Sequence, residues 1–479
     1  MFDSMIYVML AFPLIAAIIS VLPKHRVREL ASLISSLVCL IVSANLLYLT
    51  LSARVNHTIS IHGFHLFYID LPSSVILFLI QAVYFLAVLY SINFVNEIWR
   101  KRDLFLRRRH YYALINLFAM SMTFAAASRN LGLMWVGLEA TTIVSALLIV
   151  LERNKASIEA AWRYIIVASA GLGIALFSLI LFHAFAGTLD WTRAEMSARA
   201  ATIVAVLALV GFGTKVGIFP MHTWLPDAHG TAPPAVSAML SATLLPVAML
   251  SYLRVFEVAA GAGALKVVYI TCFAGAITAL VAAILAFTQR IVKRLFAYSS
   301  MDVMGIGLVG IGLSAFSPVA LKATLLLLVI HAFSKSALFF TGGNVILGLG
   351  THEIKNVRAL ISKTKLTGVS MVLSSLAVTG APPFATFLAE IVIIALSFSV
   401  PYLTFLLVSA MLLSFLSVNY HVTKMCFGTD RSGRSDRPGK LELHMLSELV
   451  PAIACLTSLA ISVAVWLLLV RGALGGVLP

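Results

Sequence analysis

Apolar runs of about 20 residues, separated by short polar links, follow one another along almost the whole chain of 479 residues. A helix needs about 20 apolar residues to cross the roughly 30 Å hydrocarbon core of a membrane. Hydrophobic residues make up 61% of the chain and charged residues only 11%, which excludes a soluble globular protein. The pattern predicts an all-α polytopic membrane protein. About fourteen transmembrane helices are expected, near residues 5–22, 30–51, 73–96, 111–128, 131–151, 161–187, 200–228, 235–257, 266–288, 294–315, 319–348, 366–398, 401–424 and 449–471.

These spans leave no room for a soluble domain, so residues 1–479 are expected to form a single transmembrane domain. The first run, Met5–Leu22, lacks both a basic start and a small-residue cleavage site. It is therefore predicted to be the first span and not a removable signal.

The net charge of +15 comes from Lys and Arg residues that concentrate in alternate links between the predicted spans. The basic links lie near residues 24–28, 100–109, 153–155, 290–294, 355–365 and 424–440. The other links carry little beyond Arg54, Arg129, Arg193, Arg199, Arg254 and Lys266. Because cytoplasmic loops are enriched in Lys and Arg, the alternation predicts an even number of spans with both termini outside the cytoplasm. It also argues against a nucleic-acid-binding protein.

The motifs that hold redox or nucleotide cofactors are missing from the sequence. Cys39, Cys272, Cys426 and Cys455 lie far apart, without a Cys-x-x-Cys pair, and no Gly-rich phosphate loop occurs. We therefore expect this chain to bind no cofactor and no metal, and not to be an enzyme on its own.

Two predicted spans are interrupted by glycine and proline beside an ionisable residue. In the first, Pro220 and Pro226 interrupt the helix after Lys215, and the second break lies in Thr379–Glu390. Paired broken helices are typical of transporters built from inverted repeats, with the ion site where the repeats meet. We predict two inverted five-helix repeats with broken helices 7 and 12, although two unrelated proline kinks would give the same pattern. The predicted layout places three spans in 1–110, repeat one in 111–257, repeat two in 266–424 and a last span in 449–479.

Glu139 and Lys215 lie near the middle of predicted spans, where an unpaired charge is unfavourable by a few kcal/mol. An isolated carboxylate there is forced neutral unless a cation lies nearby, which makes Lys215 the natural partner of Glu139. The two residues form either a structural ion pair or a switchable pair on an ion path. We favour the switchable pair, because intramembrane charges usually mark ion routes.

His331 and Lys335 are four residues apart and therefore share one helix face. A histidine changes charge near neutral pH, and desolvation lowers the pKa of a lysine towards that range. The two side chains could receive and pass a proton. With Glu390 in the second broken span, they complete a predicted proton path of Glu139, Lys215, His331, Lys335 and Glu390.

Four further polar residues are predicted to assist this path. Asp302 is a buried acid that is either functional or a carboxylate held by nearby hydroxyl groups. His222, Asp227 and His229 follow the first break and are expected to connect the path to the cytoplasm.

In these segments the chain resembles the antiporter-like, proton-translocating membrane subunits of respiratory complex I, Mrp antiporters and membrane-bound hydrogenases. The matching segments are 135–139, 215–229, 293–300, 331–335 and 382–390. The resemblance implies a fourteen-helix fold with two inverted five-helix bundles and discontinuous helices 7 and 12. It also implies a multi-pass protein of a prokaryotic cell membrane.

Segments 137–146 and 157–164, together with Asp302 and the acid at position 390, are most similar to the component F branch of hydrogenase-4. This resemblance implies that Glu139 and Lys215 form a modulating pair, His331 and Lys335 a central relay, and Glu390 an outer gate. Many relatives carry a lysine or another polar residue where this chain has Pro246. Because proline cannot hold a proton, that relay step is expected to use water or a hydroxyl group such as that of Thr243.

The leading hypothesis is a proton-translocating, non-redox subunit of a membrane-bound hydrogenase or a related complex I-like assembly. Its expected partners are other membrane subunits, the lipid bilayer and a hydrogenase-like or iron–sulfur peripheral arm on the cytoplasmic side. The alternatives are a subunit of a cation/proton antiporter, the membrane subunit of an inorganic-carbon uptake system, and a scaffold that has lost transport.

Overall fold

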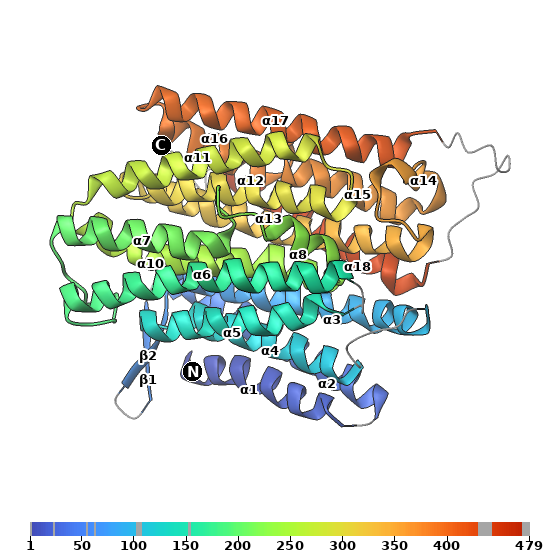
Figure 1. Cartoon of the computed structure of the whole chain (residues 1–479), viewed down its shortest axis with the longest axis horizontal. Coiled ribbons are helices and arrows are strands. Elements are labelled where there is room, and N and C mark those ends of the chain that lie inside the picture. The colour runs from blue at the N-terminus through green and yellow to red at the C-terminus, as the bar shows by residue number, and fades with distance from the viewer. Residues whose placement is uncertain are drawn as a thin grey trace. The chain divides into compact units, whose positions relative to one another are not determined.

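The computed structural model describes residues 2–22, 24–53, 56–61, 64–101, 108–151, 155–429 and 443–471, most of which lie in helices (Figure 1). The helices up to the first break are α1 (Phe2–Ser20), α2 (His25–Ala53), α3 (Leu71–Lys101), α4 (Arg108–Ala127), α5 (Leu131–Ile149), α6 (Lys155–Ala186) and α7 (Ala198–Val216). The next are α8 (Leu225–Thr231), α9 (Pro234–Met239), the π-helical turn η1 (Leu240–Leu244), α10 (Leu245–Gly261), α11 (Leu265–Phe287), α12 (Val292–Leu313) and α13 (Pro318–Leu349). The remainder are the 3-10 turn η2 (Ile354–Asn356), α14 (Leu360–Lys363), α15 (Lys365–Val378), α16 (Ala385–Ser397), α17 (Pro401–Phe427) and α18 (Met445–Val470).

The predicted helical membrane fold is confirmed. Twelve helices in the described part of the chain are long and apolar enough to cross a membrane, and α15 and α16 are shorter apolar helices. Each predicted span coincides with one helix or with consecutive helices. The exact number of crossings and the inverted repeats stay predictions.

The described residues group into two compact units, each with its own buried interior. Unit 1 comprises residues 1–88, 103–224 and 243–271, and unit 2 comprises residues 89–102, 225–242 and 272–479. Among the described residues, the chain passes between the units inside α3, at the start of α8, inside the π-helical turn η1 and inside α11.

The link between α2 and α3 in unit 1 forms a β-hairpin, which the sequence analysis did not predict. Strand β1 (His57–Ile61) pairs antiparallel with β2 (Phe64–Ile69), with His57 opposite Ile69 and a bulge at Ile59/Ser60. The hairpin lies at the same end of unit 1 as the start of α1 (Figure 1), where Phe2 stacks on His57. The alternation of polar and apolar residues in 57–61 and the run of aromatic and aliphatic residues in 64–69 were its signals in the sequence.

Both predicted helix breaks are present, and a glycine in the left-handed region ends the first helix of each pair. Gly217 (φ +87°) follows α7, and Gly380 (φ +67°) lies just after α15. Pro220 lies in the non-helical segment 217–224, as predicted. The expectation for Pro226 was wrong, because this proline lies in the first turn of α8, where its missing N–H has no helical partner to lose.

Glycines also allow pairs of helices to approach to backbone contact within each unit. In unit 1, a Cβ atom on Gly211 of α7 would lie 2.4 Å from the backbone nitrogen of Ala175 in α6. In unit 2, a Cβ atom on Gly305 of α12 would lie 2.6 Å from the carbonyl oxygen of Gly275 in α11. Small residues at such contacts are the usual means of close helix packing in membranes.

We predict that Gly305→Ala lowers the free energy of unfolding by about 1–3 kcal/mol, because the added methyl group meets backbone atoms that cannot move aside. Thermal unfolding of the purified protein in mild detergent measures the change. Gly173→Ala in α6 is the control, because a Cβ atom there meets nothing within 4 Å. Equal stability of Gly305→Ala and the wild-type protein would contradict the close contact between α11 and α12.

Candidate functional site

Lys215 lies in the last turn of α7 in unit 1 and is fully buried. Its Nζ donates to the hydroxyl of Thr142 at 2.6 Å and to that of Tyr164 at 2.7 Å. The Tyr164 hydroxyl also bonds the hydroxyl of Ser145 at 2.8 Å, and its ring packs against Trp224 at the end of the first break. The lysine is therefore solvated by neutral hydroxyl groups from α5 and α6.

Glu139 of α5 is half-buried and does not contact Lys215 directly. Its Oε1 accepts from Ser169 of α6 at 2.9 Å, while its Oε2 is buried with no hydrogen-bond partner among the described residues. The carboxylate still acts electrostatically on Lys215. Glu139 and Lys215 therefore interact electrostatically over a distance, and within the described residues they form no contact ion pair.

Lys335 and His331 lie on α13 in unit 2, and both are buried. Nζ of Lys335 donates to the carbonyl of Phe296 at 2.9 Å and also bonds the hydroxyl of Ser299, both on α12. Nε2 of His331 faces the carbonyl of Ser241 at 3.4 Å. As at Lys215, neutral oxygen atoms surround the basic groups.

Thr243, whose hydroxyl is expected to serve the relay step at the Pro246 position, lies in the π-helical turn η1 three residues before that proline. Its hydroxyl donates to the sulfur of Met122 at 3.3 Å, in unit 1. Ser241, two residues earlier in the same π-helical turn, lies in unit 2, and its hydroxyl bonds that of Ser300 at 2.7 Å. A π-helical turn rotates side chains away from α-helical positions, so the sequence alone could not distinguish Ser241 from Thr243.

Glu390 in α16 is 2% exposed, and its carboxylate lies against the second helix break. A Cβ atom on Gly380 would lie 1.9 Å from its Oε2, so only glycine leaves room for the carboxylate. Oε2 of Glu390 and the hydroxyl of Thr386, one turn earlier on the same helix, are buried without a hydrogen-bond partner among the described residues. Such unpaired polar atoms are costly unless water or a proton satisfies them.

Asp302 of α12 has one satisfied and one unsatisfied oxygen atom. The hydroxyl of Ser414 in α17 donates to Oδ2 at 2.6 Å, and Oδ1 is buried without a partner within the described region. Asp302 acts electrostatically on both Lys335 and Glu390. The hydroxyl contact agrees with the structural alternative, while the second oxygen remains available to a proton.

Asp227 and His229 lie on the short helix α8 in unit 2, and His222 lies in the first break in unit 1. Asp227 forms a 2.6 Å ion pair with Arg294 of α12. His229 is fully buried and stacks on Phe339 of α13. His222 is partly covered by Phe219.

Lys293 is a buried charge that the sequence analysis assigned to a cytoplasmic link. It lies in the first turn of α12, is 3% exposed, and its Nζ donates to the carbonyl of Ala232 at 2.5 Å. It also acts electrostatically on His229. Its position beside a predicted span made it look like an ordinary boundary lysine, and only tertiary packing shows its burial.

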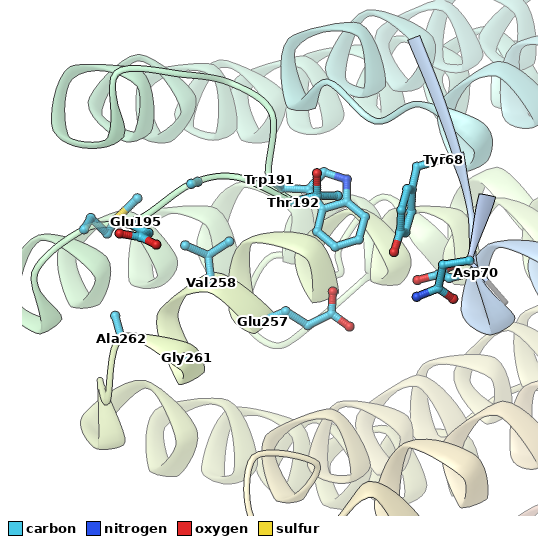
Figure 2. A pocket seen from close by; sticks show the side chains of 12 residues that line it. Tyr68, Asp70, Trp191, Thr192, Glu195, Glu257, Val258, Gly261 and Ala262 are labelled. Carbon is cyan, nitrogen blue, oxygen red and sulfur yellow. The ribbon is translucent and has the colours of Figure 1, made fainter. Parts of the chain in front are cut away.

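In unit 1, a second cluster of charged residues, which pair directly with one another, lies beside a pocket of about 740 Å³. Figure 2 shows Tyr68, Trp191 and Glu257 converging on this pocket, with Glu195 at its other end. Arg254 of α10, which was expected in a link, contacts Glu257 and Trp191 of this pocket and is fully buried.

The guanidinium of Arg254 makes four hydrogen bonds to neighbouring side chains. It donates to both oxygens of Asp70 at 2.7 and 2.8 Å, to Ser73 at 2.7 Å and to Glu257 at 3.2 Å, and it stacks on Trp191. Burial by itself would raise the pKa of Asp70, but the Arg254 guanidinium and the hydrogen bonds from Arg254 and Ser73 hold it below its ordinary value of 3.8. The carboxylate therefore stabilises the fold above pH 3.8, and this contribution is lost as the pH falls through the lowered pKa.

The two kinds of buried charge differ in whether they can change protonation state without breaking an ion pair. The Arg254–Asp70 pair is a closed ion pair in which each partner holds the other's charge. Lys215, Lys335, Asp302 and Glu390 are held by neutral groups or have an unpaired atom, so each can change protonation without breaking a contact ion pair. Within the described residues no three His, Cys, Asp or Glu side chains are arranged to hold a metal ion; that the chain binds no cofactor stays a prediction.

Comparison with known proteins finds related chains along most of the sequence. Residues 128–417 match the family described as "NADH:quinone oxidoreductase/Mrp antiporter, TM". A hydrogenase-4 component F homolog of Methylacidiphilum infernorum (isolate V4) is 33% identical over 362 residues, covering 72% of this chain and 75% of that protein. NADH-quinone oxidoreductase subunit N of Desulfitobacterium hafniense is 28% identical over 408 residues, covering 79% and 80%.

Solved structures with the same fold come from several assemblies. A chain of the Mrp complex from Dietzia sp. DQ12-45-1b superposes with a TM-score of 0.83 at 19% identity, covering 98% of this chain and 96% of that chain. A chain of respiratory complex I from Thermus thermophilus superposes with a TM-score of 0.76 at 21% identity, covering 97% and 98%. At these identities the likeness shows the fold.

We predict that Arg254→Met lowers the free energy of unfolding by about 3–5 kcal/mol, because it leaves Asp70 as an unpaired buried carboxylate. Thermal unfolding of the purified protein at neutral pH measures the loss. Arg193→Ala is the matched control, because Arg193 pairs with Asp190 at 3.7 Å on the surface, where such pairs contribute about 0–1 kcal/mol. Similar stability of the two variants would show that Arg254 is not the structural charge described here.

Proposed function

The chain belongs to the family of NADH:quinone oxidoreductase and Mrp antiporter membrane subunits, and from this we propose that it moves protons for a membrane-bound hydrogenase or related respiratory complex. Membership of the family confirms the predicted resemblance to antiporter-like subunits. The chain is a multi-pass, antiporter-like membrane subunit of the class found in complex I, Mrp and membrane-bound hydrogenase assemblies.

The observation that supports proton movement is the set of buried ionisable groups that neutral atoms solvate. Lys215 in unit 1 and Lys335 in unit 2 each donate to hydroxyl or carbonyl oxygens, and Glu390 is buried with an unpaired oxygen. Burying such groups is unfavourable, so a purely structural role would favour closed pairs like Arg254–Asp70 or apolar replacements. Intramembrane ionisable residues usually mark ion routes.

In unit 1, Glu139 and Lys215 are the residues proposed to take up and release protons. A proton that neutralises Glu139 removes the negative charge that favours the Lys215 ammonium, so the ammonium releases its proton more readily. The hydroxyls of Tyr164 and Thr142 lie within hydrogen-bond distance of Nζ and can receive and pass that proton. Low-dielectric surroundings strengthen each of these couplings.

In unit 2, His331 and Lys335 form the proposed central relay, with Asp302 and Glu390 as the acids beyond it. Asp302 acts electrostatically on both Lys335 and Glu390, so a proton arriving at one group shifts the proton affinity of the next. His229 and Lys293 extend the set of buried bases toward α8 and the start of α12. The basic links predict that this end faces the cytoplasm.

We propose that electron transfer in partner subunits drives this movement. The component F homolog that covers 72% of this chain is named for a hydrogenase, which supports a hydrogenase-like or iron–sulfur peripheral arm as partner. The Mrp complex chain of the same fold keeps a subunit of a cation/proton antiporter as the second candidate. Purification of the native assembly and identification of its polypeptides distinguishes the two.

We predict that Lys215→Ala and Glu390→Gln each abolish proton pumping while the complex still assembles and its electron transfer continues in part. Both variants remove a titratable group without opening a contact ion pair, so the redox chemistry of the partners has no direct reason to fail. Quenching of a pH-sensitive dye in inverted membrane vesicles measures pumping, and donor oxidation in the same vesicles measures electron transfer.

Lys322→Ala serves as the control, because Lys322 is an exposed lysine on the same helix as Lys335. It is expected to pump at the wild-type rate. Unchanged pumping in both Lys215→Ala and Glu390→Gln would rule out the proposed function.

A further inference from the structure

We propose that Ser241 is a positioning residue for His331: its carbonyl fixes the tautomer of the ring, and its hydroxyl links the ring's surroundings to those of Lys335. This inference rests on the proposed proton-translocating function and concerns how its central relay is built. Every residue of the cluster (Ser241, Phe296, Ser300, His331 and Lys335) lies in unit 2.

The Ser241 carbonyl lacks one possible helical partner because the helix is irregular at this point. Residues Leu240–Leu244 form a π-helical turn, in which a carbonyl bonds the amide five residues later. For Ser241 that amide belongs to residue 246, which is proline and has no N–H. Pro246, at the position where relatives are expected to carry a lysine, therefore offers no N–H to the Ser241 carbonyl.

The Ser241 carbonyl faces the ring of His331. Nε2 of His331 lies 3.4 Å from the Ser241 oxygen, and a carbonyl oxygen can only accept a hydrogen bond. Nε2 therefore carries the hydrogen of the neutral ring, and Nδ1 carries the lone pair. Nδ1 is buried and has no hydrogen-bond partner within the described residues, so it is the atom that takes up a proton.

The length of the contact suits a relay. A separation of 3.4 Å is at the long end for an N–H···O bond, so the carbonyl selects the tautomer without holding the ring tightly. The ring is 1% exposed, which excludes bulk water as a competing partner for Nε2.

The Ser241 hydroxyl extends the arrangement to Lys335. The Ser300 hydroxyl donates to the carbonyl of Phe296 at 2.9 Å, so in its 2.7 Å bond with Ser241 the Ser241 hydroxyl is the donor. Nζ of Lys335 donates to the same Phe296 carbonyl at 2.9 Å. Loss or gain of a proton at Lys335 changes the strength of its hydrogen bond to the Phe296 carbonyl. This change alters the hydrogen bond from Ser300 to the same carbonyl, and through Ser300 it affects Ser241.

The test compares Ser241→Ala, Ser300→Ala and the double variant in inverted vesicles that contain the full complex. Each single variant removes the same hydroxyl link, and we expect each to lower the ratio of protons pumped to electrons transferred by about fivefold. The double variant is expected to lose no more than either single variant, because the link is already broken. A structural defect would instead lower pumping and electron transfer together and would add up in the double variant.

Two further variants complete the test. Pro246→Ala restores an N–H that competes with His331 for the Ser241 carbonyl, and a similar fall in the ratio is expected. Ser251→Ala is the matched control, because its buried hydroxyl bonds only the Val247 carbonyl of its own helix in the described contacts, and its ratio should stay unchanged.

The outcomes distinguish failure of the proposed role of Ser241 from failure of the proposed proton-translocating function. A normal ratio in Ser241→Ala and Pro246→Ala, together with loss of pumping in Lys215→Ala, overturns the role of Ser241 and leaves the proposed function standing. Normal pumping in Lys215→Ala and Glu390→Gln as well defeats both. Additive losses in Ser241→Ala and Ser300→Ala also overturn the proposed link.

Discussion

The high free energy of a charge in a water-excluded interior is the constraint on which the rest of this structure depends. Each buried ionisable side chain needs compensation, and the protein supplies it in two ways. Arg254 is matched by Asp70 and Glu257, which cancels its charge and closes one end of unit 1. Lys215 and Lys335 receive only hydroxyl and carbonyl oxygens, so loss of a proton from either lysine leaves no contacting carboxylate without its partner.

Irregular backbone lies beside several of the buried ionisable groups. Helices satisfy their own carbonyls, so a regular span has few acceptors to offer a buried cation. The two breaks and the π-helical turn change this. Gly380 leaves room for the Glu390 carboxylate, Trp224 packs against Tyr164 beside Lys215, and the Ser241 carbonyl reaches His331. Local departures from helical geometry and the unpaired charges therefore occur together in each unit.

The helical membrane fold, both helix breaks and the family were predictable because each depends on local sequence. A run of 20 apolar residues has few options in a membrane, and glycine clustered with proline beside an ionisable residue favours a break in a helix. Predictions that depended on which atoms meet across helices were less accurate. Glu139 and Lys215 interact only at long range, Pro226 lies in the first turn of a helix, and Ser241, which the sequence did not single out, faces His331.

By itself, the sequence determined that the chain spans a membrane as helices, that two of these helices are broken, and which ionisable residues occur inside them. Hydrophobic length and residue type carry that information, because the cost of transfer into lipid is a property of each segment alone. Only the tertiary structure decided which charges are closed pairs and which are solvated by neutral groups. It also showed that Lys293 and Arg254 are buried, since burial depends on neighbours that are distant along the chain.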